Sequence, residues 1–288
     1  MDQLAQQLVN GIMVGAIYAV VAIGFGLVFS VLDVLNMTHI PLVVSGGYIT
    51  YLALFLVDNI VAVILASALV TLLIGMAIER FVLRPIRDAD VLTSFVVTMG
   101  VALAFQYGIQ LVFGADGVRV NAPSFGPFSV GGAAFSTMQL LVLAMSAVML
   151  VGVRYYVVST RWGRAARAVA ERRYLAAGLG IDVNRVSQLT VGISAALAGV
   201  AGAGIALSQG ILEPFMGVTF GIKAWVALIV AGNKSIAGIV GVALALGIIE
   251  ALVAGYVSSQ WRDAIAYALM IGVLVARPRG VFGSFEAE

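Results

Sequence analysis

The sequence predicts an all-α protein that crosses a membrane several times. Hydrophobic residues make up 62% of its 288 residues and charged residues only 10%, whereas a soluble globular protein carries about 25% charged residues. Its mean hydropathy is +1.09. Apolar runs recur at roughly the 20-residue length that crosses the hydrocarbon core of a bilayer, and little chain is left between them. We therefore expect the whole chain, residues 1–288, to form a single transmembrane domain without room for a soluble catalytic domain.

We predict about nine helical segments, each from one of these apolar runs. The seventh and the ninth are too short for a straight crossing, and short apolar segments flanked by glycine are typical of broken or partly re-entrant helices. The expected number of transmembrane helices is therefore about eight to ten, some of them short or broken. In order along the chain the segments are Leu8–Leu32, Ile40–Val57, Ile60–Ile78, Leu92–Phe113, Thr137–Val158, Val186–Ala206, Thr219–Ala231, Ile236–Ala254 and Asp263–Ala276.

The first segment is expected to be retained, because residues 1–10 contain no Lys or Arg and no clear cleavage site, and so lack the positive region of a signal peptide. The distribution of Lys and Arg predicts its direction. With the N-terminus outside, every Lys and Arg falls on the cytoplasmic side except Arg119, Lys223 and Arg262, which is a strong positive-inside signal. The C-terminus is then cytoplasmic.

Two loops are predicted on the outer side. The first, residues 114–136, contains the glycine- and proline-rich stretch Gly114–Ala134, where Pro123 and Pro127 favour an irregular or hairpin-like loop. The second, Leu207–Val218, contains the pair Glu213 and Pro214.

The first, sixth and eighth segments carry small residues at four-residue spacing, which allows helices to approach closely. Tight packing is the simpler interpretation, and a hinge is the alternative. The residues are Gly11, Gly15 and Ala19, then Ala195, Gly199 and Ala203, then Gly241 and Ala245.

A strongly basic segment, within the predicted cytoplasmic loop 159–185, separates two long apolar runs. In it, Tyr174, Leu175 and Leu179 would give a helix of one to two turns an apolar surface, and Gly180 is a natural stop. Such a helix suits docking to a partner protein. The alternative, an arginine cluster that only orients the chain in the membrane, would not need these apolar residues. The arginines are Arg161, Arg164, Arg167, Arg172, Arg173 and Arg185.

Enzymatic chemistry has little support in the sequence. The chain has one histidine, no cysteine and no clustered carboxylates, so it lacks the groups for a metal centre or a catalytic triad. The nearest approach to a phosphate-binding loop, Ala231–Ser235, has Asn233 where the second glycine must stand. The arginines have no interleaved aromatic residues that would stack on bases, so nucleic acid is not an expected partner. We expect no catalytic residue, metal or cofactor in this chain.

Two charges are predicted within the membrane. Lys223 lies about one turn inside the outer end of the seventh segment, and Glu250 about one turn inside the outer end of the eighth. A charge at mid-membrane costs about 2.5 to 3.5 kcal/mol and normally has a partner or a water-filled cavity. Antiparallel neighbours would place these residues at the same depth, which predicts an ion pair. The favoured interpretation is that this ion pair holds the helices together. The alternative is that it lines a substrate route.

Other polar residues lie in or beside the predicted spans. Asn36 and His39 stand at the junction between the first two segments, just before Pro41, which suits a helix start. A structural role for His39 is favoured over a proton relay. Gln106 and Gln110 lie one helical turn apart, and they either face a polar route or bridge to a neighbouring helix.

Short motifs stand in a characteristic order and spacing along the chain: Gln6–Gly11, Gly15–Ala19, Val34–His39, Gly163–Ala165, Gly180–Val186, Gly221–Trp225, Gly247–Leu252, Trp261–Asp263 and Arg277–Gly280. Through their shared order and spacing, the chain resembles the branched-chain amino acid (LivH-like) permease family of ATP-binding-cassette importers over essentially its whole length. No single motif carries the resemblance.

The resemblance implies a multi-pass protein of the bacterial inner membrane that carries amino acids inward by alternating access. It would work with a second permease, LivM-like or an identical copy, two LivG/LivF-like ATP-binding subunits that hold ATP and Mg, and a periplasmic solute-binding protein. The loop 159–185 would then be the coupling element. The residues expected to contact the ATPase subunit are Glu171, Tyr174, Leu175, Ala176, Leu179 and Gly180.

Two departures from the family pattern keep other substrates open. Family members commonly have glycine and an acidic residue where this chain has Ile40 and Pro41, and a glycine-rich loop where it has Ala231–Ser235. Import of urea, short amides or aromatic acids is therefore an alternative. A stand-alone secondary transporter is less favoured, because it would need ion-coordinating carboxylates near mid-membrane, and most acidic residues here lie in loops or at segment ends.

Overall fold

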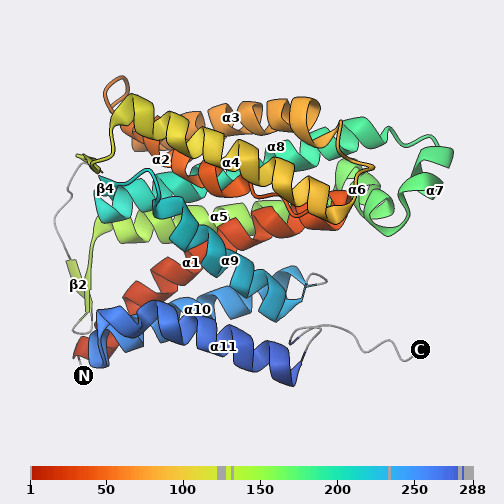
Figure 1. The fold of residues 1–288 in the computed structure, drawn as a ribbon. Helices are drawn as coiled ribbons and strands as arrows, with labels where there is room; N and C mark the ends of the chain where they lie inside the picture. Colours follow the sequence, from red (N-terminus) through yellow and green to blue (C-terminus); the bar gives the residue numbers. More distant parts are fainter. Residues whose placement is uncertain (1, 122–127, 131–132, 233–234, 278–280, 282–288) are drawn as a thin grey trace. The chain divides into compact units, whose positions relative to one another are not determined.

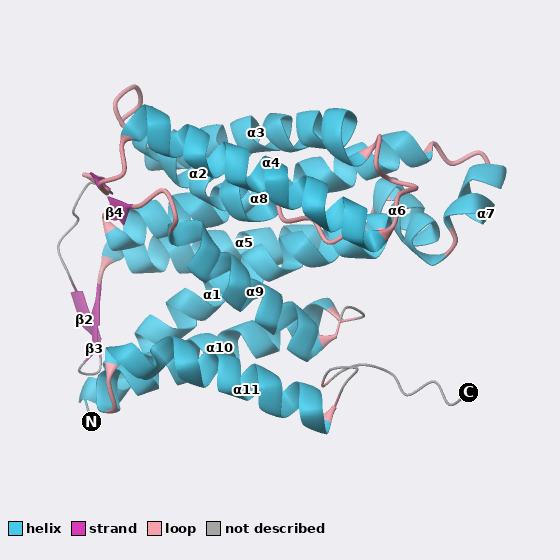
Figure 2. Cartoon of the chain, viewed as in Figure 1, coloured by secondary structure: helices cyan, strands magenta, loops and turns pink. Residues whose placement is uncertain are grey.

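The computed structural model describes residues 2–121, 128–130, 133–232, 235–277 and 281, which are overwhelmingly helical (Figure 2). Pro123, Pro127, Asn233, Lys234 and Arg279 lie outside this part of the chain. The chain forms two compact units. The first comprises Met1–Ile23, Pro123–Ala147 and Phe220–Glu288, and the second Gly24–Ala122 and Val148–Thr219.

Each predicted apolar segment forms a helix, so the all-α, polytopic prediction is confirmed (Figure 1). Six helices are long and apolar enough to cross a membrane, within the described residues, and α9 is a shorter apolar helix. α9 and α11 have only 16 and 15 residues, in line with the expected short segments. The helices are α1 (Asp2–Leu32), α2 (His39–Ala53), α3 (Ile60–Ile78), α4 (Val91–Phe113), α5 (Thr137–Ser159), α8 (Val183–Gln209), α9 (Met216–Ala231), α10 (Ile236–Tyr256) and α11 (Arg262–Ala276).

The second predicted segment is shorter than expected, because α2 ends at Ala53 rather than at Val57. The chain turns away after Ala53 and exposes Phe55 and Leu56. Asn59 then caps α3, its side chain accepting hydrogen bonds from two backbone N–H groups of the first turn. The run was apolar enough to predict a longer helix, but the cap of α3 requires a turn before it.

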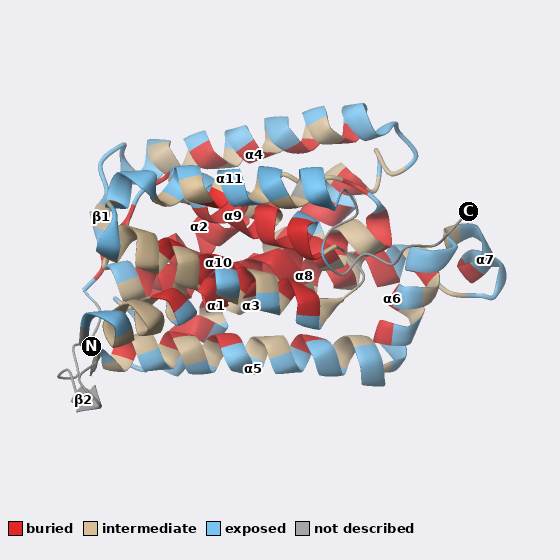
Figure 3. Cartoon of the chain, turned by 90° about the horizontal axis from the view of Figure 1, so that it is seen from below, coloured by how far each residue is buried: buried red, intermediate tan, exposed pale blue. Residues whose placement is uncertain are grey.

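The core of the second unit lies where α2, α3 and α8 pack together, and α8 is buried along most of its length (Figure 3). A Cβ atom on Gly46 would lie 2.5 Å from the Cα of Gly199, so the two backbones are in direct contact. The hydroxyl oxygen of Ser67 in α3 lies 2.9 and 3.1 Å from their two carbonyl oxygens, which share its single hydrogen. The small-residue pattern of the sixth segment is thus a packing surface, as predicted.

The first unit contains a second close helix pair. A Cβ atom on Gly11 of α1 would lie 2.6 Å from the Cα of Ile248, and one on Gly15 would lie 2.7 Å from the Cα of Leu244, both in α10. The prediction for the eighth segment was wrong in detail, because a Cβ atom on Gly241 would meet nothing within 4 Å. Gly247 makes the contact with α1 instead.

By contrast, α4 and α5 expose most of their surface along their length (Figure 3). Val96, Leu111 and Val112 of α4, and Val148 and Val151 of α5, are exposed apolar residues. In a chain with this composition, hydrocarbon is the solvent that such faces suit.

Short strands occur in the predicted outer loops. β2 (Phe128–Val130) and β3 (Ala133–Phe135) pair as an antiparallel hairpin, in agreement with the hairpin-like loop predicted there. β1 (Val118–Arg119) pairs with β4 (Ile211–Leu212), and this pairing joins two loops that are far apart in sequence. It was not predicted.

The basic segment forms two helices, α6 (Arg161–Glu171) and α7 (Arg173–Gly178), at the end of the second unit opposite β1 and β4 (Figure 1). Only one short helix was predicted here, so α6 is a correction. Thr160 caps it by accepting from the backbone N–H of Gly163 at 3.0 Å. Gly163, Ala166 and Val169 then recur every three residues and are buried, which gives α6 one packing face.

Candidate functional site

α7 presents bulky apolar side chains on its outer surface. Tyr174 is 89% exposed, Leu175 63% and Leu179 82%. Exposed apolar residues clustered beside a polar, arginine-rich segment are typical of a surface that a partner covers.

The other predicted contact residues take different positions around α7. Ala176 is buried, so its side chain packs inward and does not belong to the exposed surface. Glu171 is the last residue of α6 and is exposed. Gly180 is exposed and follows the helix directly.

Gly180 stops α7 with a Schellman motif. Its φ is +83°, its N–H donates to the carbonyl of Ala177, and the N–H of Ile181 donates to the carbonyl of Ala176. A residue with a Cβ atom rarely adopts this φ, so glycine is required where the chain leaves α7. The exit of the chain from the exposed helix therefore has a defined geometry.

A cluster of charges surrounds the buried residues Lys223 and Glu250 in the first unit. Lys223 Nζ of α9 lies 3.0 Å from Glu250 Oε2 of α10 and 2.7 Å from Asp263 Oδ1 of α11. Arg262 Nε donates to the same Glu250 oxygen at 3.0 Å, and the Tyr18 hydroxyl of α1 donates to it at 2.9 Å. Two cations and two carboxylates from three helices thus balance one another, with a tyrosine from a fourth.

The structure therefore brings Lys223 and Glu250 together, and both are 1% exposed. Sequence reasoning missed Asp263, Arg262 and Tyr18. Arg262 and Asp263 stand at the start of α11, where the sequence alone indicated a membrane boundary rather than a contact. Glu250 Oε1 is buried without a hydrogen-bond partner among the described residues.

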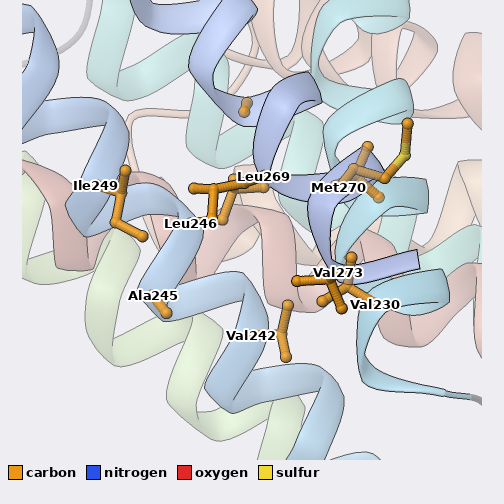
Figure 4. Close-up of a pocket in the computed structure, with 10 residues that line it drawn as sticks. Val230, Val242, Ala245, Leu246, Ile249, Leu269, Met270 and Val273 are labelled. Atoms are coloured by element: carbon orange, nitrogen blue, oxygen red, sulfur yellow. The ribbon is translucent and has the colours of Figure 1, made fainter. Parts of the chain in front are cut away.

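A small cavity lies one helical turn from these charges, between α9, α10 and α11 (Figure 4). Its volume is about 160 Å³. All of its lining side chains are apolar, so it offers hydrocarbon contacts only. They include Val226, Leu246, Ile249, Ala266 and Leu269.

His39 lies in the second unit, in the first turn of α2, and is buried. Its Nδ1 is 3.1 Å from the hydroxyl oxygen of Ser194 in α8, and that hydroxyl donates to the carbonyl of Gly24 at 2.8 Å. The hydroxyl of Ser194 thus contacts both the ring of His39 and the main chain of α1. The ring also packs on Phe25, with centroids 4.4 Å apart. His39 thus joins α1, α2 and α8.

The remaining candidate residues make local contacts in the second unit. Asn36 accepts hydrogen bonds from the N–H and hydroxyl of Thr38, at 3.1 and 2.6 Å, which forms the turn before α2. Gln106 is buried and donates to the carbonyl of Pro214 at 3.2 Å, so α4 is bonded to the loop before α9. Gln110 is half-buried.

The described residues contain no group of three or more His, Cys, Asp or Glu that would hold a metal ion.

Comparison with known proteins gives a consistent result. Residues 7–274 match the family described as "Branched-chain amino acid transport system / permease component". BraD, a high-affinity branched-chain amino acid transport system permease protein of Pseudomonas aeruginosa, is 34% identical over 98% of this chain and 97% of its own. The corresponding LivH of Escherichia coli is 32% identical over 98% and 96%. A probable LivH of Methanocaldococcus jannaschii is 26% identical over 95% and 91%. No solved structure matches the chain.

Proposed function

Because this chain belongs to the family of branched-chain amino acid transport permeases, we propose that it forms the transmembrane path of an ATP-driven importer for these amino acids. The single observation behind the proposal is the match to the family over residues 7–274, with relatives 32% and 34% identical over 98% of the chain. The chain is a multi-pass inner-membrane protein. Its apolar helices are the part of the transporter that crosses the bilayer.

The substrate class is that of the relatives. The three relatives described above are all named for branched-chain amino acids, so this class is favoured over urea, short amides or aromatic acids. The departure at Ile40 and Pro41 is compatible with the fold, because Pro41 lies in the first turn of α2, where proline is tolerated. The other departure includes Asn233 and Lys234, which lie outside the described residues.

The chain works by alternating access, and ATP is hydrolysed on separate subunits that carry the nucleotide and Mg. Two ATP-binding subunits, a second permease subunit and a periplasmic binding protein complete the importer. A ligand shifts an equilibrium only by binding two states with different affinity, so nucleotide must act on the permease through a contact that differs between states.

That contact is α7. Its support is the exposed Tyr174, Leu175 and Leu179 on a short helix with a defined exit at Gly180. α7 faces the cytoplasm, because the distribution of Lys and Arg places the N-terminus outside and residues 159–185 inside.

The buried charges hold α9, α10 and α11 together rather than bind the transported solute. The support for this role is that Lys223 already contacts two carboxylates, while Glu250 already accepts from Lys223, Arg262 and Tyr18. Removing one member of a buried ion pair leaves the other charge uncompensated, so the loss of Lys223 or Glu250 alone should loosen the packing of these helices.

The test is uptake by the assembled importer in proteoliposomes, with ATP inside and the loaded binding protein outside. The wild-type importer should take up leucine, isoleucine and valine, and not urea. The double variant Leu175→Asp, Leu179→Asp should insert normally into the membrane. Its uptake should fall at least about tenfold, because aspartates on α7 would oppose docking of the ATP-binding subunit.

The matched control is Leu175→Met, Leu179→Met, which keeps the face of α7 apolar and should retain uptake. Undiminished ATP-driven uptake by the aspartate variant would show that α7 is not the contact. A wild-type importer that moves none of the three amino acids would refute the substrate class.

A further inference from the structure

Glu79 is a carboxylate enclosed at the end of a membrane helix. It opens a five-residue π-helix, η1 (Glu79–Leu83), that continues α3, and it is fully buried. π-helical turns within α-helices occur frequently at functional sites. Burying a carboxylate costs free energy unless it is paired with a cation, so the residues that pair with Glu79 show which elements it connects.

The partner of Glu79 is Arg87, which follows η1 in the loop before α4. The Arg87 Nη2 group donates to Glu79 Oε1, and the Arg87 side chain is only 5% exposed. Arg84 Nε is also near the same carboxylate oxygen, at 3.9 Å. Glu79 Oε2 has no hydrogen-bond partner among the described residues, so the whole hydrogen-bonded connection runs through one oxygen and one guanidinium.

The same guanidinium reaches a third element. The Arg87 Nη1 group donates to Asn184 Oδ1 at 2.8 Å, and Asn184 is the second residue of α8, directly after α7 and its exit turn. A planar guanidinium holds two acceptors in fixed directions, which a lysine ammonium would not do. We name these residues the Glu79–Arg87–Asn184 bridge.

A second contact joins the same loop to α7. Arg173 Nη1 of α7 lies 3.2 Å from Asp88 Oδ1, one residue after Arg87. The Arg173 side chain is partly exposed and that of Asp88 largely so, and this ion pair therefore contributes little energy by itself. It places the loop 84–90 directly between η1 and the α7–α8 segment.

We infer that Glu79 and Arg87 are positioning residues that couple α7 to the membrane helices. α7 has six residues and is linked to α8 by a short turn. If the start of α8 were not anchored, a displacement of α7 would only change the conformation of this turn and would not move α8. The bridge anchors it to the end of α3, and α3 and α8 share the core of the second unit. A displacement of α7 should therefore move both α3 and α8. The inference rests on the proposed function, in which α7 receives the ATPase subunit.

The experiment compares variants of the assembled importer in proteoliposomes and measures leucine imported per ATP hydrolysed. Asn184→Ala removes only the exposed end of the bridge, so folding is retained. Glu79→Gln removes the charge that orients Arg87. Each variant should lower the ratio of leucine to ATP by about fivefold or more, the usual size of an energetic coupling. The ratio is compared between preparations with equal amounts of intact complex, whose yield should be unchanged for Asn184→Ala because Asn184 is exposed.

Two matched controls separate coupling from simple stability. Asn184→Asp keeps the acceptor for Arg87 and should retain the wild-type ratio. Arg185→Ala removes a neighbouring arginine whose ion pair with Asp182, at 3.0 Å, is exposed and stays within one turn of α8. It too should retain the ratio.

The inference is overturned if Asn184→Ala and Glu79→Gln both import leucine at the wild-type ratio, or if their loss of uptake only follows a loss of intact complex. The wild-type importer distinguishes this test from that of the proposed function. If it imports no branched-chain amino acid, the substrate class fails. The bridge is then still decided by how strongly the binding protein stimulates ATP hydrolysis by the complex, which Asn184→Ala should lower and Asn184→Asp should not.

Discussion

Lys223 and Asp263 lie closer to each other than Lys223 and Glu250, at 2.7 Å against 3.0 Å. Lys223 is almost fully buried, whereas the Asp263 side chain is 56% exposed. The ammonium group therefore lies between one buried carboxylate and one that reaches solvent. This asymmetry decides what happens when either partner is removed.

Lys223→Met should destabilise the protein by about 3–5 kcal/mol, because it leaves the buried charge of Glu250 with Arg262 alone to compensate it. Glu250→Gln should cost less, since Lys223 keeps Asp263. The double variant should recover part of the loss, because it leaves neither buried charge. Thermal unfolding of the purified protein in detergent measures all three, and strictly additive losses would contradict the pairing.

Gly180→Ala should disturb the exit of α7, since a φ of +83° costs a residue with a Cβ atom about 1–2 kcal/mol. We expect uptake by the assembled importer to fall while the amount of protein in the membrane stays the same. Gly178→Ala is the control, because Gly178 is helical and a Cβ atom there meets nothing within 4 Å. Equal uptake by the two variants would argue against a role for the turn.

Gly46→Ala should separate the backbones of α2 and α8 and cost about 1–3 kcal/mol, as overpacking of a core usually does. Gly241→Ala in α10 should be neutral or stabilising, because it adds a good helix former in open space. Chemical denaturation in the same detergent compares them. A Gly46→Ala protein as stable as the wild type would show that the close contact can relax freely.

Asp90 caps α4 and gives the protein an acid-sensitive contribution to stability. Hydrogen bonds from the side chain and backbone of Thr93 lower the pKa of Asp90. Because the folded pKa lies below the unfolded value of about 3.9, the contribution is complete above that pH and is lost as the pH falls through the folded pKa.

Asp90→Asn keeps a cap and should remove this part of the pH dependence. The measurement is the midpoint of thermal unfolding from about pH 6 down to about pH 3, across the titration of a carboxyl group. Identical pH profiles for the wild type and Asp90→Asn would contradict the assignment.

The helices of the membrane were predictable because apolar runs of sufficient length have few alternatives to a helix in a bilayer. α6 was not predicted, since its buried face consists of Gly163, Ala166 and Val169, which are small and alternate with arginines. The pairing of Val118 with Leu212 was also missed, because two-residue strands carry almost no local signal and their partners are far apart in sequence.

Some contacts of the candidate sites could likewise be predicted from the sequence, and others could not. The equal depth of Lys223 and Glu250 in the membrane, on two antiparallel segments, was enough to predict that they meet. The same argument gave no indication of Asp263, which lies at the end of a third helix. The exposed face of α7 followed from composition, whereas the connection of Arg87 to Asn184 depends on how two loops meet and has no pattern in the sequence.

The contact of Gly46 with Gly199, reinforced by Ser67, limits how the second unit can move. Helices that touch through their main chains have no intervening side chains whose rotamers could accommodate sliding. α2, α3 and α8 should therefore move together as one rigid body. If the transporter opens to either side of the membrane, the other helices must move relative to these three.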